Sequence, residues 1–118
     1  MLDNGRILIF DNNGRKHSSG IFEYNLKTKR NSWRYIGTDD RPFYSKFCGT
    51  VDRLPNGNTL VTESDNGRAF ELTRDKEIVW EFHNPARAGD NNEFIAALFE
   101  VERLPADTDL SWLPPTTP

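Results

Sequence analysis

Residues 50–85 of this chain read TVDRLPNGNTLVTESDNGRAFELTRDKEIVWEFHNP. Short runs of apolar residues lie in this stretch, and turn residues such as Asn-Gly separate one run from the next. Within the runs apolar and polar side chains alternate, as in Phe70, Glu71 and Leu72. Such alternation is typical of pleated strands that present two distinct faces. We therefore predict antiparallel strands at 50–54, 58–63, 68–73 and 78–82.

The same pattern occurs earlier in the chain. Three segments align with this stretch: LDNGRILI (2–9) with LPNGNTLV (54–61), GIFEY (20–24) with RAFEL (68–72), and SWRY (32–35) with VWEF (79–82). A third copy begins with VERLP (101–105), which matches VDRLP (51–55). A period of about 50 residues with four short strands per copy is typical of a β-propeller blade.

The predicted fold class is all-β, with antiparallel four-stranded blades and about two blades per chain. If the strands of one copy are called a, b, c and d, residues 1–105 read b-c-d, a-b-c-d, a, and residues 106–118 form a Pro-rich C-terminal tail. The remaining strands are expected at 6–11, 20–26 and 32–36, with an eighth within 94–104.

The composition is that of a folded domain with a slightly acidic charge balance. The 118 residues include three Trp, three Tyr and eight Phe, which supply large side chains for a core. The net charge is -3 and no basic block is present, so we expect no nucleic-acid partner. No apolar run approaches the roughly 20 residues that cross a bilayer, and no signal peptide is visible, so we expect no membrane partner and leave the compartment open.

Residues 53–85 resemble, nearly position for position, a pattern of the arylsulfotransferase-like family of β-propellers. The resemblance extends to RILIFDNNG (6–14) and, more weakly, to ERLP (102–105). It implies a propeller fold and, in active members, transfer of sulfuryl groups between phenols through a transiently sulfated histidine on strand a. The matching positions here hold GTVD (49–52) and FEVE (99–102), so no catalytic histidine is carried over.

Two functions follow as hypotheses. The empty histidine positions favour a non-catalytic, propeller-type module that binds or scaffolds, whose small-molecule ligand the sequence does not identify. The alternative is part of an arylsulfotransferase-type enzyme whose active residues lie upstream or in a variant arrangement. We expect no cofactor and no metal site, because the single Cys48 excludes multi-cysteine zinc sites and the Asp-Asn clusters lack the spacing of a calcium loop.

About two blades cannot close a propeller, because blade faces are buried only by neighbours around a ring. We therefore expect a homo-oligomer in which the last strand a of one subunit completes the b-c-d strands of the next, with three copies giving six blades. The rival explanation is that the chain is a piece of a longer protein with further blades upstream.

The candidate ligand-binding residues are Arg53, Arg103 and Cys48. Arg53 and Arg103 lie at the ends of equivalent a strands and are candidates for an anion site. Cys48 is a candidate nucleophile or ligand contact, although a packed thiol is the favoured interpretation. His17 and His83 are expected to be solvated, with no role in a ligand site.

Other polar and aromatic residues have structural interpretations. Trp33 and Trp80 occupy equivalent positions on strand d, so we expect both to pack between blades. The clusters at residues 11–14, 65–67 and 90–93 are predicted to be Asx turns. The basic cluster of Lys27, Lys29 and Arg30, together with Arg34 on the first strand d, is predicted to be a solvated hairpin tip.

Overall fold

The computed structural model describes residues 1–15 and 17–115. Its first sheet has the order β1-β2-β3, with β1 at Ile7–Arg15, β2 at Ser18–Asn25 and β3 at Arg30–Ile36. Its second sheet has the order β4-β5-β6-β7, with β4 at Thr50–Arg53, β5 at Thr59–Glu63, β6 at Arg68–Leu72 and β7 at Ile78–His83. A small hairpin pairs β8 (Arg87–Ala88) with β9 (Phe94–Ile95).

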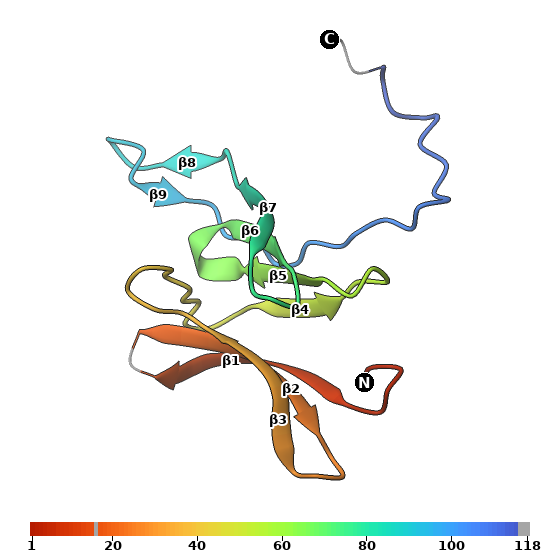
Figure 1. Ribbon diagram of the computed structural model, residues 1–118. Coiled ribbons are helices and arrows are strands. Elements are labelled where there is room, and N and C mark those ends of the chain that lie inside the picture. The colour runs from red at the N-terminus through yellow and green to blue at the C-terminus, as the bar shows by residue number, and fades with distance from the viewer. Residues whose placement is uncertain (16, 116–118) are drawn as a thin grey trace.

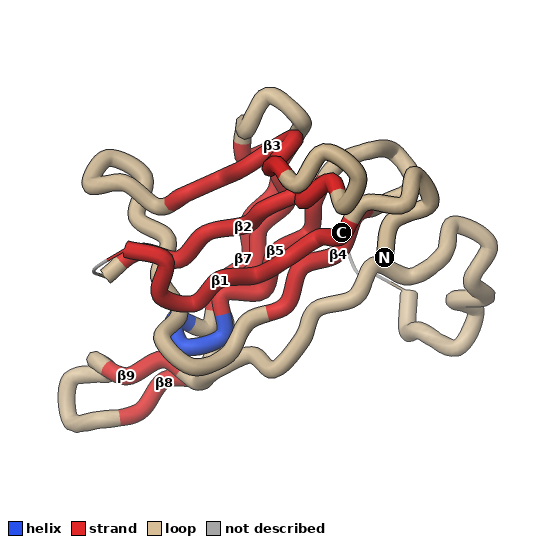
Figure 2. Tube along the Cα trace, turned by 90° about the horizontal axis from the view of Figure 1, so that it is seen from below, coloured by secondary structure: helices blue, strands red, loops and turns tan. Residues whose placement is uncertain are grey.

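The predicted all-β fold with antiparallel pairing is confirmed. Within the described residues, helical structure is limited to one 3-10 turn, η1 at Ser64–Asn66. Figures 1 and 2 both show the β8-β9 hairpin projecting from the body formed by the two larger sheets. Over residues 1–15 and 17–115, none of the three sheets closes on itself. Residues 116–118 of the predicted tail lie outside the described residues.

The Asn-Gly pairs at residues 4–5 and 56–57 form the same turn, one before β1 and one before β5. Each glycine has a positive φ, 76° and 89°, a conformation that glycine adopts without steric cost. Its N–H donates to the carbonyl oxygen three residues earlier, at 2.9 Å in both turns. Each asparagine side chain accepts a hydrogen bond from the backbone N–H two residues later, at 3.0 Å in both turns. The prediction that Asn-Gly forms a turn between strands is confirmed at residues 56–57, and the same turn occurs at residues 4–5.

The first and second sheets share one register. Every Cα pair that joins β5 to β6 has a counterpart between β1 and β2; for example, Phe22 lies opposite Ile9 as Phe70 lies opposite Val61. The pairing of β2 with β3 likewise corresponds to that of β6 with β7, including one register shift at the same place in each. The segments that align in the sequence therefore occupy corresponding positions in the two sheets.

The core lies between the facing surfaces of the first and second sheets, which Figure 1 shows one above the other. Its buried members are Ile21, Trp33, Tyr35, Phe43, Val61, Phe70 and Leu72. Phe43 comes from the loop that connects the sheets. Its ring lies 5.4 Å from that of Phe10 and 5.5 Å from that of Phe70, edge to face in both cases. A loop residue therefore joins the aromatic side chains of the two sheets.

The region after β7 differs from the expected last strand. β9 falls within the range 94–104 where an eighth strand is predicted, but it pairs with β8. Residues 98–105, all of which the structure describes, carry no strand assignment. Leu98 N donates to the Ser64 carbonyl oxygen at 3.2 Å and Val101 N to Oγ1 of Thr62 at 3.0 Å. The segment thus runs beside β5 without a ladder, because its backbone contacts are single bonds to a turn carbonyl and a side chain.

Within the described residues, no helix is both long and apolar enough to span a membrane.

Candidate functional site

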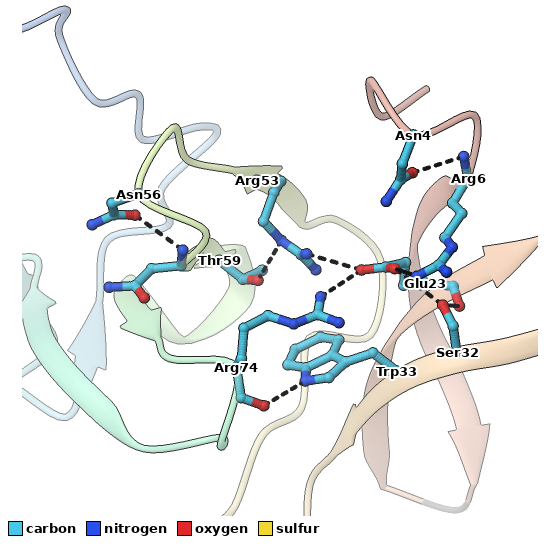
Figure 3. Close-up of polar contacts among 10 residues, drawn as sticks. Asn4, Arg6, Glu23, Ser32, Trp33, Arg53, Asn56, Thr59 and Arg74 are labelled. Carbon is cyan, nitrogen blue, oxygen red and sulfur yellow. Dashed lines mark hydrogen bonds and ion pairs between the residues drawn. The ribbon is translucent and has the colours of Figure 1, made fainter.

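A buried carboxylate, Glu23, lies at the interface of the two sheets (Figure 3). Its side chain is 1% exposed. Oε1 accepts hydrogen bonds from Nη1 of Arg6 at 2.7 Å and from Oγ of Ser32 at 3.0 Å. Oε2 accepts hydrogen bonds from Nη1 of Arg53 at 2.8 Å and from Nη1 of Arg74 at 2.6 Å. These four donors match the roughly four lone-pair positions of a carboxylate.

The three arginines reach Glu23 from separate elements. Arg6 precedes β1, Arg53 ends β4, and Arg74 lies in the turn between β6 and β7. A buried carboxylate is tolerated only when it is paired and hydrogen-bonded. Because two of its partners belong to the second sheet, Glu23 links the two sheets electrostatically. We call Arg6, Glu23, Ser32, Arg53 and Arg74, together with Trp33, the Glu23 cluster.

Trp33 is the aromatic member of the Glu23 cluster. Its Nε1 donates to the backbone oxygen of Arg74 at 2.8 Å. The guanidinium carbons of Arg53 and Arg74 lie 5.4 Å and 5.7 Å from its ring centroid, within cation–π range. Trp33 is 8% exposed and packs between the two sheets, whereas its packing between propeller blades stays a prediction.

The pKa of Glu23 is about 2, below its ordinary value of 4.5. Burial is the largest single influence and would raise this pKa, because it disfavours the charged form. The hydrogen bonds from the four donors together outweigh burial and lower the pKa. The carboxylate therefore stays ionised at neutral and mildly acidic pH.

A smaller cluster with the same types of residue lies on the second sheet. Glu71, whose side chain is 6% exposed, accepts hydrogen bonds from Nη2 of Arg103 at 2.5 Å and from Nδ2 of Asn58 at 2.7 Å. The hydrogen bond from Asn58 is the largest influence on its pKa and lowers it. The guanidinium carbon of Arg103 lies 6.0 Å from the ring centroid of Trp80. We call Glu71, Asn58, Arg103 and Trp80 the Glu71 cluster.

The two clusters differ in how far they are covered. Glu71, Arg103 and Trp80 align with Glu23, Arg53 and Trp33. Among the residues that the structure describes, no second arginine contacts Glu71. Trp80 is 40% exposed, so the expectation that it packs between sheets is not met within this chain. The Glu71 cluster is therefore an open counterpart of the Glu23 cluster.

The structure places the two candidate anion-binding arginines in different clusters. Arg53 pairs with Glu23 and Arg103 pairs with Glu71. Each guanidinium therefore already faces a carboxylate. An anion held by both arginines stays a prediction.

Cys48 is exposed, so the favoured interpretation as a packed thiol is wrong. The physical reason is its position in a loop, because β4 begins only at Thr50. The backbone oxygen of Cys48 accepts hydrogen bonds from Nδ2 of Asn12 at 3.0 Å and from Oγ of Ser45 at 2.5 Å. These bonds fix the loop and leave the thiol at the surface. A ligand contact by Cys48 stays a prediction.

The two histidines are exposed. The ring centroid of His17 lies 5.7 Å from that of Tyr44. His83 ends β7, and its Nε2 lies 2.6 Å from Oε1 of Glu81, an oxygen that also accepts a hydrogen bond from Nε of Arg68 at 2.9 Å. These three residues line a pocket of about 470 Å³. The sequence gives no signal for this group, since the antiparallel pairing of β6 with β7 alone brings Arg68 opposite His83.

The Asp-Asn clusters do not all form the predicted Asx turns. Oδ1 of Asp11 accepts a hydrogen bond from the Asn13 N–H at 3.1 Å, which is the predicted Asx turn. Oδ2 of Asp65 instead accepts the N–H groups of Lys46 and Phe47, at 2.6 Å and 3.1 Å, and so fixes the connecting loop. Across residues 1–15 and 17–115, no three His, Cys, Asp or Glu side chains gather as a metal-binding group.

Glu23, Arg6 and Arg74 are the site residues that the sequence reasoning missed. For Glu23 a signal was present, because the aligned c strands share a glutamate and the aligned a strands share an arginine. Two opposite charges that recur together at equivalent positions indicate a structural ion pair.

A family model described as Arylsulfotransferase (ASST) matches residues 2–85. This chain belongs to the arylsulfotransferase (ASST) family. The match spans β1 to β7 and includes every member of the Glu23 cluster. The part of this arylsulfotransferase-family chain that the family model describes is therefore its first and second sheets. No curated protein and no solved structure matches the chain.

Proposed function

We propose that this arylsulfotransferase-family chain is a non-catalytic, propeller-type scaffold whose neighbouring blades are joined by an arginine–glutamate–tryptophan cluster. In this proposal the first sheet is strands b-c-d of one blade, and the second sheet is strands a-b-c-d of the next. The shared register of the sheets, their matching Asn-Gly turns and their face-to-face core support it.

The observation that carries the proposal is that the guanidinium of Arg53 is paired with the buried carboxylate of Glu23. Transfer of a sulfuryl group needs cationic donors that are free to hold the sulfate oxygens as charge develops. Arg53 instead bonds Glu23 through Nη1 and Thr59 through Nε, at 2.8 Å and 3.1 Å, and its side chain is 14% exposed. Arg103 is likewise paired, with Glu71. Both guanidiniums are thus paired with a carboxylate of this chain, Arg53 in a buried position and Arg103 with its side chain 48% exposed.

The residues at the expected histidine positions support the same conclusion. Residues 49–52 and 99–102 hold no histidine, and a nucleophilic imidazole is the group that a sulfated-enzyme mechanism requires.

A transfer assay tests the proposal. The purified chain is incubated with p-nitrophenyl sulfate and a phenol acceptor, and release of p-nitrophenol is followed with heat-unfolded chain as the control. We expect no release above that control. Release that depends on the folded chain and on the acceptor would overturn the non-catalytic role.

One observation favours the alternative, an arylsulfotransferase-type enzyme. His83, paired with Glu81 and close to Arg68, lines a pocket and has the composition of a base beside a cationic donor. His83→Ala and the matched control His17→Ala separate the two functions in the same assay. We expect both variants to equal the background. Turnover that is lost in His83→Ala and kept in His17→Ala would establish the enzyme.

A further inference from the structure

We propose that the outer face of the second sheet binds the outer face of the first sheet of a second copy of this chain. In this contact residues 100–103 of one copy add as a strand to the free edge of β1 in the next copy. The inference rests on the proposed blade-joining role of the Glu23 cluster and names the partner that the Glu71 cluster accepts.

The outer face of the second sheet resembles a surface that is already buried within the chain. Trp80 and Phe82 on β7 align with Trp33 and Tyr35 on β3. Trp33 and Tyr35 are 8% and 4% exposed because the second sheet covers them, whereas Trp80 and Phe82 are each 40% exposed. The rings of Trp80 and Phe82 are stacked, with their centroids 6.4 Å apart. Trp80 and Phe82 therefore form an exposed apolar surface that is equivalent to the one that Trp33 and Tyr35 bury against the second sheet.

The outer face of the first sheet resembles the face of the second sheet that packs against the first sheet. Ile9 and Phe22 lie opposite each other in the first sheet, as Val61 and Phe70 do in the second. Val61 and Phe70 are fully buried against the first sheet, whereas Ile9 is 40% exposed and Phe22 is half-buried. The two outer faces of one chain are therefore equivalent to the two faces that pack together inside it, which makes the chain complementary to its own copy head to tail.

The strand edge shows the same complementarity. β5 pairs with β4 on one side and with β6 on the other, and Val51 of β4 lies opposite Val61 of β5. β1 is equivalent to β5 but lies at the edge of its sheet, with β2 on one side only. Residues 100–103 align with β4 and form no ladder with any residue that the structure describes. Transfer of the β4-β5 register places Val101 of one copy opposite Ile9 of the next, by strand addition to a free edge.

Charge complementarity identifies what completes the Glu71 cluster. In the Glu23 cluster the second guanidinium comes from Arg74, in the turn between β6 and β7. The corresponding turn of the first sheet, between β2 and β3, carries Lys27 and Lys29, and Arg30 follows it as the first residue of β3. All three are exposed, and none forms an ion pair with another described residue. In the docked pair this turn brings positive charge to Glu71, which among the described residues of one chain pairs with Arg103 alone.

A head-to-tail contact of this kind closes into a ring when its rotation suits a whole number of copies. Each copy contributes two stacked sheets. Propellers have about four to eight blades, and three copies would supply six. We therefore expect a trimer with three times the 13.6 kDa mass of one chain.

Sedimentation velocity at micromolar concentration tests the contact on three forms of the full chain. The wild-type chain is expected to sediment as the trimer. Ile9→Lys puts a charge in the apolar contact, and Lys27→Glu with Lys29→Glu reverses the charge of the turn. We expect each to raise the concentration at half-assembly by about tenfold or more. The matched control, Lys46→Glu with Arg87→Glu, makes the same change in net charge elsewhere on the surface and is expected to assemble like the wild type.

Circular dichroism melting confirms that each variant is folded. A wild-type chain that remains a monomer would overturn self-association and would leave further blades of a longer polypeptide as the occupants of these faces. Equal weakening by the turn variant and its matched control would also overturn the proposed contact. Neither result touches the non-catalytic scaffold role, which fails only through turnover in the transfer assay.

Disulfide formation tests the register. In a Cys48→Ser background, Ile9→Cys with Val101→Cys places two thiols opposite each other on neighbouring copies, within reach of a disulfide. Ile9→Cys with Glu102→Cys is the control, because a one-residue shift puts the side chains on opposite faces. We expect covalent oligomers on non-reducing gels from the first variant only. Equal cross-linking of both variants, or none in the first, would overturn the register.

Discussion

Nη1 of Arg53 lies 2.8 Å from Oε2 of Glu23, across the interface of the two sheets. The aligned residues Arg103 and Glu71 form a second ion pair at 2.5 Å. An isolated surface ion pair contributes little to stability, but both of these carboxylates are almost fully buried. Because the arginine–glutamate pair recurs at equivalent positions, we infer that it is a structural contact that helps one sheet to pack on the next.

The first prediction concerns acid. The pKa of Glu23 is about 2 in the folded chain, against an ordinary value of 4.5. A depressed pKa stabilises the fold fully above pH 4.5, and this contribution is lost as the pH falls toward 2. We expect wild type to lose on the order of 3 kcal/mol more than Glu23→Gln over this window. Urea titrations of both forms at a series of pH values measure the difference. Parallel pH curves for the two forms would contradict it.

The second prediction concerns the aromatic core. Phe43 is 1% exposed between Phe10 and Phe70, whereas Phe47, four residues on in the same loop, is 74% exposed. Phe43→Ala is expected to lower the free energy of unfolding by about 3 to 5 kcal/mol, because it removes a buried ring and leaves a cavity. Phe47→Ala, the matched control, is expected to stay within about 0.5 kcal/mol of wild type. Equal losses for the two variants would show that Phe43 does not join the sheets.

The third prediction concerns Gly49, which lies against the ring of Phe10. A Cβ atom at residue 49 would lie closer to the ring of Phe10 than packed atoms can approach. Gly49→Ala is therefore expected to cost about 1 to 3 kcal/mol of unfolding free energy, as overpacking does. Shortening Phe10 to Leu should recover part of that loss in the double variant. Additive losses from the two substitutions would mean that they do not touch.

The fourth prediction concerns the thiol of Cys48. Because this residue is exposed, a thiol reagent such as DTNB should label the native chain completely and about as fast as the unfolded chain. The time course of absorbance in the presence and absence of denaturant measures both rates. Protection of the native thiol would restore the packed interpretation.

The strands and turns could be predicted from the sequence because their signals are local. Alternation of apolar and polar residues, Asn-Gly pairs and the alignment of residues 2–35 with 54–82 were sufficient to place β1 to β7. The β8-β9 hairpin was not predicted, because its two-residue strands are too short to carry an alternating pattern. The exposure of Cys48 was also missed, since no pattern shows that the loop extends to residue 49.

The Glu23 cluster could not be assembled from local patterns. Arg6, Arg53 and Arg74 are spread over most of the matched region, and only the packing of one sheet on the other brings them to a single carboxylate. Within its own strand Glu23 has the pattern of a solvent-facing residue, and only its recurrence as Glu71 in the aligned strand indicates an ion pair. Its burial depends on the partner sheet, which a single strand does not reveal.

The most direct test of the account is a double-mutant cycle between Glu23 and Arg53. The unfolding free energies of wild type, Glu23→Gln, Arg53→Met and the double variant are measured in urea at neutral pH and one protein concentration. If the ion pair joins the sheets, the coupling energy should be about 1 to 3 kcal/mol. Effects that add to within about 0.5 kcal/mol would contradict the account, because the two residues would then act independently.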